Sequence, residues 1–376
     1  MISNKTISVT YIISNINKAL AFEWIANEIN KQKIELSFVL LNPNSSELET
    51  FLKQAGFIVK KITYKGKQSI PLALLKTFLF LKKEKTDVVH THLFDANIVG
   101  LIAAKLCGVK RRIYTRHHST YHHEFYPHAV KYDKLCNYLA TDIVAITNTV
   151  KQILIKREGV TEKEITTIEH GFKLSIFENQ DIETIKVLKH KYNPNNKYPV
   201  IGVISRYTQW KGVQYIIPAF KQLLKIYPNA KLILANANGD YNQEIKLLLK
   251  DIPTENCIEI VFEKELGALY QLFDVFVHTP IDNHSEAFGQ TYVESLAAGI
   301  PSVFTLSGIA NNFIVHKKNA LVVDYKDSDA IYHGVVEILS NAPLKIQLIN
   351  QGKLDVQNRF KLSKMILELE TLYLKK

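Results

Sequence analysis

The chain has 376 residues, of which 47% are hydrophobic and 22% charged. This length suits two domains of about 150–200 residues, each with its own core. With 15 glycines, 11 prolines and no biased tract, the composition excludes collagenous, low-complexity and disordered proteins. Three widely spaced cysteines form neither a disulfide framework nor zinc-ligand pairs, which favours a reducing compartment such as the cytoplasm.

The charge is unevenly distributed. The first 200 residues hold 29 Lys and Arg against 18 Asp and Glu, whereas the remainder holds 18 of each, so the first half carries the whole net charge of +11. This asymmetry favours an anionic partner for the first half, such as phospholipid head groups or a diphosphate-linked substrate; a solvated basic face is the alternative. The sequence contains no recognised nucleic-acid-binding module, so no nucleic-acid partner is expected.

Targeting signals are not apparent. The N-terminal residues do not resemble a signal peptide, and the most apolar stretch, residues 70–81, is too short to span a bilayer and contains Lys76. We expect a cytoplasmic protein. The apolar and basic segment 70–85 suggests peripheral docking on the inner membrane face, with an ordinary buried helix as the alternative.

Strand-length apolar runs alternate with amphipathic helical segments along the chain. In the first half we predict strands at residues 7–13, 35–41, 88–91, 112–114, 143–146 and 166–168. After a turn at residues 193–196, the pattern restarts with strands at 200–205, 231–235, 258–262, 275–278, 302–304 and 321–323. This order predicts an α/β protein with two doubly wound parallel sheets. Functional residues should then follow the carboxyl ends of strands.

Residues 278–303 are the first candidate site. A predicted strand ends near His278, and Gly289 precedes a helix that ends at residues 299–301. The first backbone N–H groups of a helix form a natural anion site. Glu286 above that site and Glu294 within the helix could accept hydrogen bonds from sugar and ribose hydroxyls. The alternative is that these acids only complement the helix dipole.

Two cations form the second candidate site. Arg206 follows a predicted strand, and Lys211 stands five residues later, before Gly212. An Arg fork and a Lys point charge at a strand–helix junction suit a diphosphate, although such residues are often merely solvated.

Histidines form the third candidate site. Seven of the 13 histidines lie between His90 and His128, many of them in loops after predicted strands. A metal site is one interpretation. Because no cysteine accompanies them and Glu124 is the nearest carboxylate, we favour histidines that hydrogen-bond sugar hydroxyls or phosphate, and expect no metal.

Together these segments resemble the retaining glycosyltransferases of family 4, also known as glycosyl transferases group 1. Glu286 and Glu294 resemble the E-x7-E motif, Arg206 and Lys211-Gly212 the R…KG motif, and residues 87–92, 114–118 and 168–177 resemble N-terminal landmarks. The resemblance implies the GT-B architecture: two facing Rossmann-like domains with a cleft between them. We expect an acceptor-side domain at 1–190, a donor-binding domain at 198–358, and a final helix at 359–376 crossing back.

The resemblance also implies roles for individual residues. Glu286 would contact the donor sugar, Glu294 the ribose, and Arg206 and Lys211 the leaving diphosphate. His117 would contact the transferred sugar. The backbone of four further residues would contact the donor sugar and diphosphate: Phe288, Gly289, Gln290 and Thr291. The implied chemistry requires no metal and no cofactor besides the nucleotide-sugar.

The sequence departs from the family pattern after its first strand. Residues 14–19 read Ser-Asn-Ile-Asn-Lys-Ala where relatives commonly carry a Gly-Gly loop. Asn15 and Lys18 are therefore candidate acceptor-side residues, together with His92 and His118 from the histidine loops.

We therefore expect a retaining glycosyltransferase that moves a sugar from a nucleotide diphosphate-sugar to a hydroxyl of a glycan or lipid-linked acceptor, in polysaccharide or glycolipid assembly. The alternatives are a GT-B sugar-nucleotide epimerase and a non-catalytic nucleotide-sugar-binding subunit. The retained acids and cations count against both.

Overall fold

A computed structural model describes residues 6–375 of the chain. These residues divide into two compact units, the first formed by residues up to 172 together with 362–375, and the second by residues 173–361. The boundary at 172 lies earlier than the predicted 190. Helices α8 (Ser175–Glu178) and α9 (Ile182–Tyr192) contact α12 (Leu266–Tyr270) and so belong to the second unit.

The first unit is built on a seven-stranded parallel sheet in the order β3-β2-β1-β4-β5-β6-β7. Its strands are β1 (Ile7–Ser14), β2 (Ile34–Asn42), β3 (Ile58–Thr63), β4 (Val88–His92), β5 (Arg111–Arg116), β6 (Asp142–Ala145) and β7 (Ile165–Thr167). Six of these match predicted strands. β3 was not predicted. It is an edge strand with two lysines, in which Ile62 is the single buried residue and the others are exposed or half-buried.

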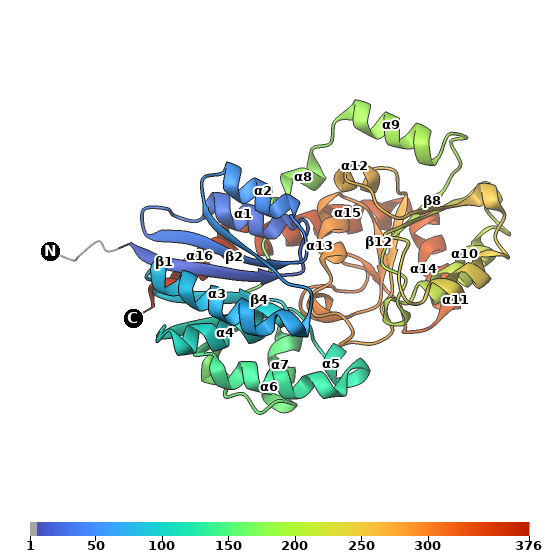
Figure 1. Ribbon diagram of the computed structural model, residues 1–376. Coiled ribbons are helices and arrows are strands. Elements are labelled where there is room, and N and C mark those ends of the chain that lie inside the picture. Colours follow the sequence, from blue (N-terminus) through green and yellow to red (C-terminus); the bar gives the residue numbers. More distant parts are fainter. Residues whose placement is uncertain (1–5, 376) are drawn as a thin grey trace. The chain divides into compact units, whose positions relative to one another are not determined.

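Helices cover both faces of this sheet (Figure 1). They are α1 (Leu20–Glu28), α2 (Glu47–Gln54), α3 (Ile70–Lys83), α4 (Phe94–Leu106), α5 (Tyr121–Phe125), α6 (Val130–Leu139), α7 (Asn148–Lys156) and the returning α16 (Leu362–Leu374). Successive residues of β1 point to opposite faces. Tyr11 accordingly belongs to the core beneath α1 and α16, and Ile12 to the core beneath α3 and α4.

The second unit is built on a six-stranded parallel sheet in the order β10-β9-β8-β11-β12-β13. Its strands are β8 (Val200–Ile204), β9 (Lys231–Ala235), β10 (Cys257–Ile260), β11 (Val275–His278), β12 (Ser302–Phe304) and β13 (Leu321–Val322). Its further helices are α10 (Val213–Leu223), α11 (Asn242–Leu249), α13 (Gln290–Ala297), α14 (Ser328–Ser340) and α15 (Ala342–Arg359). Two doubly wound parallel sheets confirm the predicted fold class.

Strand order determines where ligands can approach the second unit. β8 lies next to β11, so the order reverses between these two strands. Such a reversal opens a crevice beyond the carboxyl ends of the strands. The loop after β8 carries Arg206 and Lys211, and the loop after β11 carries Glu286.

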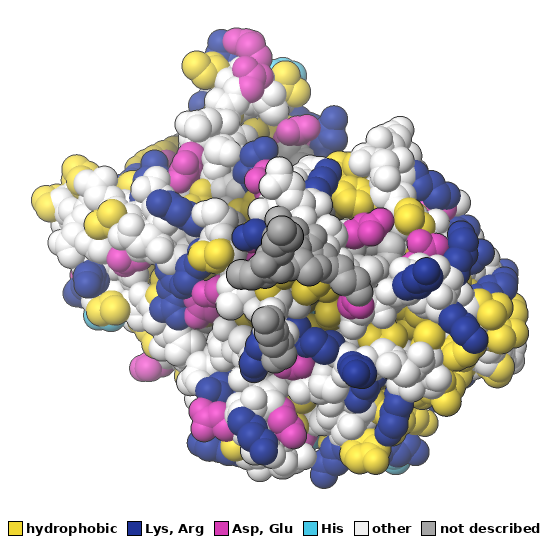
Figure 2. All heavy atoms as spheres, turned by 90° about the vertical axis from the view of Figure 1, so that its left-hand side faces the viewer, with side chains coloured by type: hydrophobic (Ala, Val, Ile, Leu, Met, Phe, Trp, Pro, Cys, Tyr) yellow, Lys and Arg dark blue, Asp and Glu magenta, His cyan; other side chains and the backbone are white. Residues whose placement is uncertain are grey.

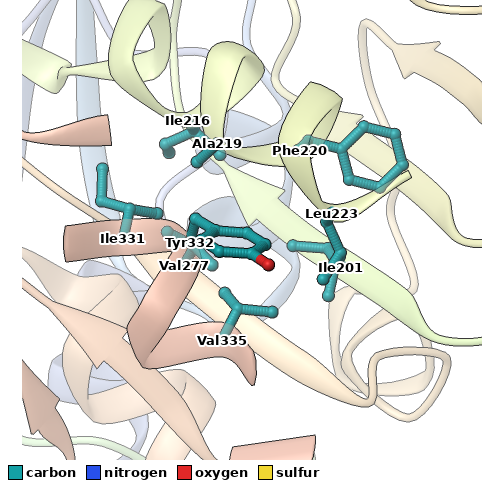
Figure 3. Close-up of a pocket in the computed structure, with 9 residues that line it drawn as sticks. All are labelled: Ile201, Ile216, Ala219, Phe220, Leu223, Val277, Ile331, Tyr332 and Val335. Carbon is teal, nitrogen blue, oxygen red and sulfur yellow. The ribbon is translucent and has the colours of Figure 1, made fainter. Parts of the chain in front are cut away.

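The hollow between α10, α14 and the sheet of this unit is a packing gap. It has a cavity volume of about 10 Å³ and is lined by side chains that include Ile201, Phe220, Val277 and Val335 (Figure 3). A gap of this size with an almost wholly apolar lining has neither the room nor the polar partners that a ligand or a stable water needs.

Candidate functional site

The loops after β8 and β11 are in close contact. Gly212 ends the 3-10 helix Gln209–Lys211 with a φ of +73°, and a Cβ placed on it would lie 1.8 Å from the carbonyl oxygen of Thr279. The Ile281 N–H donates a 3.1 Å hydrogen bond to the carbonyl of Trp210. Only glycine suits this position. Gly212 therefore allows the loop after β8, which carries Lys211, to pack closely against the loop after β11, which carries Glu286.

Three ionisable side chains converge where the two loops meet. Lys211 Nζ donates a 2.5 Å hydrogen bond to Glu286 Oε1, and His278 Nε2 lies 3.2 Å from the same oxygen. Glu286 and His278 are buried, whereas Lys211 is partly exposed. The structure therefore brings together the predicted Lys211 and Glu286, and adds His278.

The electrostatic environment keeps Glu286 ionised. Burial by itself would raise the pKa of this carboxyl, but the Lys211 ammonium and the nearby His278 together hold its pKa well below the usual range. Burial lowers the pKa of His278 despite the neighbouring carboxylate, so the imidazole is neutral near pH 7. The group therefore presents one carboxylate, one ammonium and one neutral ring.

Helix α13 begins at Gln290, four residues after Glu286. Its N-cap residue Gly289 has a φ of +85°. The first turn leaves backbone N–H groups without intrahelical acceptors. Phe288 is buried beside Gly308, whose Cβ would lie 2.7 Å from the Phe288 carbonyl oxygen. The backbone at this helix N-terminus thus has the geometry that the predicted anion site would need, and the anion site itself stays a prediction.

Several buried polar atoms in these loops lack a hydrogen-bond partner within residues 6–375. They are His278 Nδ1 and the hydroxyl oxygens of Thr208, Thr279, Ser285 and Thr291. Buried hydroxyls are normally hydrogen-bonded. Their concentration in the segments that carry Lys211, Glu286 and Gly289 marks these segments as a candidate ligand site.

Glu294 differs from Glu286 in its surroundings. It is buried within α13 and accepts a 3.0 Å hydrogen bond from the Tyr270 hydroxyl. Burial raises the pKa of Glu294 to about 7, although the Tyr270 hydrogen bond opposes the shift. Burial therefore favours the protonated form of Glu294 up to a higher pH than for an ordinary carboxyl.

The Arg206 side chain forms no ion pair with this group or with any other of residues 6–375. It is exposed just beyond β8. Because the Arg206 side chain is long and exposed, a phosphate could reach its guanidinium group. Gln290 is also exposed, at the start of α13.

In the first unit, histidines line the carboxyl ends of β4 and β5. His92 Nδ1 lies 3.1 Å from His117 Nε2, and the His117 ring stacks on His170 at a centroid distance of 5.8 Å. Burial, reinforced by the neighbouring histidines, lowers the pKa of His92 and of His117 well below the usual value. Neutral imidazoles can each offer one donor and one acceptor, as a sugar contact requires.

His118 belongs to a different network. Its Nε2 lies 3.4 Å from Asp133 Oδ1, and His122 Nδ1 lies 2.7 Å from Asp133 Oδ2. This trio has ligand atoms close enough to hold a metal ion. However, the buried Arg116 guanidinium already pairs with Asp133 at 3.2 Å and with Glu158, so the carboxylate's charge is balanced within the protein.

The loop after β1 replaces the glycines of the family pattern with asparagine. Asn15 has a φ of +54°, a left-handed conformation that asparagine tolerates better than most residues. Its Nδ2 donates a 2.8 Å hydrogen bond to Asp95. Lys18 is exposed, 3.5 Å from Glu47. Asn15 also borders an open hollow of about 380 Å³ at the ends of β1 and β2, lined mainly by Asn and Ser.

Three residues that contact the candidate site carry no role predicted from the sequence: His278, Ser307 and Tyr270. His278 Nε2 lies 3.2 Å from the Glu286 carboxylate. The Ser307 hydroxyl accepts a 3.0 Å hydrogen bond from the Glu286 N–H, and the Tyr270 hydroxyl donates a hydrogen bond to the Glu294 carboxylate. Only His278 could have been found from the sequence, because it is a histidine at the end of a predicted buried strand. The other two contacts depend on tertiary packing.

Comparisons with known proteins identify the family of this chain. Residues 25–175 match the family model described as Glycosyltransferase Family 4, and residues 184–355 match Glycosyl transferases group 1. The capsular polysaccharide biosynthesis glycosyltransferase CapM of Staphylococcus aureus is 27% identical over 80% of each chain. The alpha-monoglucosyldiacylglycerol synthase of Acholeplasma laidlawii is 28% identical over 74% of this chain and 73% of its own.

Solved structures share the fold. Anabaena HepE in complex with UDP and glucose superposes with a TM-score of 0.83 over 97% of this chain and 99% of its own, at 19% identity. A glycosyltransferase from Rickettsia africae gives 0.81 over 99% of each chain, at 20% identity. None of the helices within residues 6–375 combines the length and apolar character needed to cross a bilayer. The chain belongs to the family 4 glycosyltransferases and has their GT-B fold.

Proposed function

We propose that this glycosyltransferase moves a sugar from a nucleoside diphosphate-sugar to a hydroxyl of a glycan or lipid-linked acceptor, with retention of anomeric configuration and without a metal. The observation that carries the proposal is the contact of Lys211 with an ionised Glu286 at the N-terminus of α13. A cation, a helix N-terminus and a buried carboxylate match a diphosphate joined to a sugar.

The reaction breaks the bond between the anomeric carbon and the diphosphate oxygen, and joins that carbon to the acceptor oxygen. The acceptor's proton leaves with the diphosphate. Lys211, Arg206 and the first N–H groups of α13 would stabilise the negative charge that develops on the leaving group. A resident metal commonly serves this purpose, and here these groups would supply the positive charge instead.

Retention is favoured by the state of Glu286. Its carboxylate is engaged by Lys211 and lies beside His278, which suits it to accept hydrogen bonds from the sugar rather than to attack the anomeric carbon. The departing diphosphate and the arriving hydroxyl would then occupy the same face of the sugar. His117, in the first unit, would offer its neutral ring to the transferred sugar.

The relatives suggest an acceptor class. CapM is named for capsular polysaccharide biosynthesis, and the Acholeplasma relative for glucosyldiacylglycerol synthesis. We therefore assign this chain to polysaccharide or glycolipid assembly on the cytoplasmic side of the membrane. HepE binds UDP and glucose, which makes UDP-sugars the first donors to test.

The test is a transfer assay with UDP-, GDP- and ADP-sugars and a diacylglycerol or undecaprenyl-linked acceptor, with magnesium or with EDTA. We expect one donor to be used equally under both conditions, and proton NMR of the product to show the anomeric coupling of the donor. An inverted anomer would overturn retention, and loss of activity in EDTA would overturn metal independence. Epimerisation of the donor without transfer, or nucleotide binding without turnover, would replace the proposal with the corresponding alternative.

A further inference from the structure

An exposed row of leucines lies on helix α3 of the first unit. The helix packs through Ala73, Thr77, Phe80 and Leu81, which are buried. Leu72, Leu75 and Leu79 are 51%, 55% and 54% exposed. A helix that has met its packing needs with one face has no structural need for three leucines on the other.

Lysines flank this row. With 3.6 residues per turn, Leu72, Leu75 and Leu79 fall within about one quarter of the helix circumference, with Lys76 and Lys83 beside them and Lys82 at the opposite edge. The sequence from Gly66 to Lys83 contains no acidic residue. Lys76 has no ion-pair partner anywhere in residues 6–375. Lys83 pairs with Glu84 at 3.4 Å. The outer face of α3 is therefore apolar along its centre and has lysines at its margins, of which Lys83 is ion-paired.

The neighbouring helices α4 and α6 also expose large apolar side chains next to a lysine. α4 contacts both α3 and α6. Leu106, the last residue of α4, is 70% exposed, and Tyr138 of α6 is 75% exposed with Lys105 Nζ 4.7 Å from its ring centroid. Figure 2 shows lysine and arginine side chains interspersed with hydrophobic ones over the surface that it views. We call Leu72, Leu75, Leu79, Leu106 and Tyr138, with Lys76, Lys82, Lys83 and Lys105, the α3–α4–α6 face.

We propose that the α3–α4–α6 face docks the enzyme on a bilayer rich in anionic phospholipid. The leucines would enter the interface between head groups and acyl chains, while the lysine stems lie along the apolar layer and their ammonium groups meet the phosphates. Charge complementarity selects this partner, because the whole excess of positive charge lies in residues 1–200. The inference does not depend on the transfer reaction.

The position of α3 determines which loops of the first unit would face the membrane. β3 ends at Thr63, and α3 begins at Ile70 shortly afterwards, so the start of α3 lies at the edge where parallel strands end. The acceptor-side Asn15 and His92 lie at the same edge, and Tyr64 joins it through a 3.1 Å hydrogen bond to Asp95, the partner of Asn15. A membrane beneath α3 would therefore adjoin the acceptor-side loops.

The experiment is co-sedimentation of the full chain with vesicles of equal parts phosphatidylglycerol and phosphatidylcholine, or of phosphatidylcholine alone. The test variant carries Leu72→Ser, Leu75→Ser and Leu79→Ser. The control removes three leucines of similar exposure elsewhere, Leu247→Ser, Leu354→Ser and Leu367→Ser, which are 61%, 50% and 64% exposed. A third variant replaces Lys76, Lys82 and Lys83 with Gln. Circular dichroism and the thermal-shift response to UDP verify folding and the donor site separately.

We expect the wild type and the control to pellet with anionic vesicles, and the leucine variant to bind at least about tenfold more weakly. The lysine variant should lose its preference for anionic over neutral vesicles, as should the wild type in high salt. No pelleting of the wild type, or equal pelleting of the leucine variant and the wild type, would overturn the proposal. The proposal would also be overturned if the wild type did not bind vesicles but self-associated in sedimentation velocity, and if the leucine variant did not self-associate.

Discussion

Lys211 and Glu286 are 75 residues apart in the chain, yet Nζ and Oε1 are separated by only 2.5 Å. Each neutralises the other while the site holds no donor. A diphosphate would compete with Glu286 for the ammonium and release carboxylate oxygen for the sugar hydroxyls. In the proposed reaction the pair would thus couple recognition of the phosphates to recognition of the sugar.

Replacing Lys211 with Ala should lower kcat by about 10²–10³-fold, because a positive charge aimed at the leaving group is lost. Lys221→Ala is the matched control, since Lys221 is exposed and pairs with Asp251 at 2.8 Å on the surface. Steady-state kinetics of both variants test this. Equal rates for the Lys211 variant and the control would remove Lys211 from the reaction.

Glu286→Gln should change how stability depends on acid. The pKa of Glu286 is lower in the folded protein than its ordinary value of 4.5. Its ionised form therefore stabilises the fold above about pH 4.5, and this contribution disappears as the pH falls through the lowered pKa. We expect the wild type to lose more stability than Glu286→Gln between about pH 6 and pH 3 in urea unfolding. Parallel curves would contradict the assigned environment.

Glu294→Gln should have the opposite pH signature. The folded pKa of about 7 exceeds the ordinary 4.5, so the folded protein binds the proton more tightly and wild-type stability falls as the pH rises from about 4.5 to 7. At pH 8 the ionised, buried carboxylate costs about 3 kcal/mol. The glutamine variant should therefore gain Tm relative to wild type at pH 8 but not at pH 4, while its affinity for nucleoside diphosphate falls. A variant less stable than wild type at pH 8 would refute this account.

Thr279→Val tests whether the unpartnered hydroxyls serve the ligand. Valine keeps the shape of threonine but removes an oxygen that is buried without a partner in the described chain. Without ligand, Tm should stay the same or rise slightly, because no internal hydrogen bond is lost. Donor KM should rise by about tenfold if that oxygen bonds the donor. An unchanged KM would show that the hydroxyl faces no ligand.

Gly212→Ala should disrupt the loop contact. Its new Cβ would overlap the Thr279 carbonyl, whereas Gly159, with a similar φ of +76°, has no atom within 4 Å of that position. Gly159→Ala should therefore cost only the conformational strain of about 1 kcal/mol. Gly212→Ala should lower Tm much further and abolish donor binding. Similar Tm values for the two variants would show that the two loops do not need their close approach.

The sequence predicted the features that repeat or are local. Alternating apolar runs located both sheets, and Glu286, Glu294, Lys211 and Gly289 followed from residue type and spacing after strands. It missed β3, because an edge strand with a single buried residue lacks a buried apolar run. It also missed the partners His278, Tyr270 and Ser307, because these contacts join segments through packing that no local pattern records.

The loop after β1 shows a different limit of sequence reasoning. The absence of Gly-Gly suggested an altered backbone, yet Asn15 adopts a left-handed conformation at φ +54°. A single asparagine can therefore supply a turn for which relatives use glycine, while its side chain bonds Asp95. Residue identity alone did not distinguish a lost turn from a preserved one.

The return of α16 to the first unit affects how this protein is made. Leu362, Met365, Leu369 and Tyr373 complete the core beneath α1, and the Tyr373 hydroxyl contacts both Tyr11 and His90. These residues are synthesised after the whole second unit. The unit that is synthesised first consequently finishes folding second, because its apolar face stays open until α16 has been synthesised.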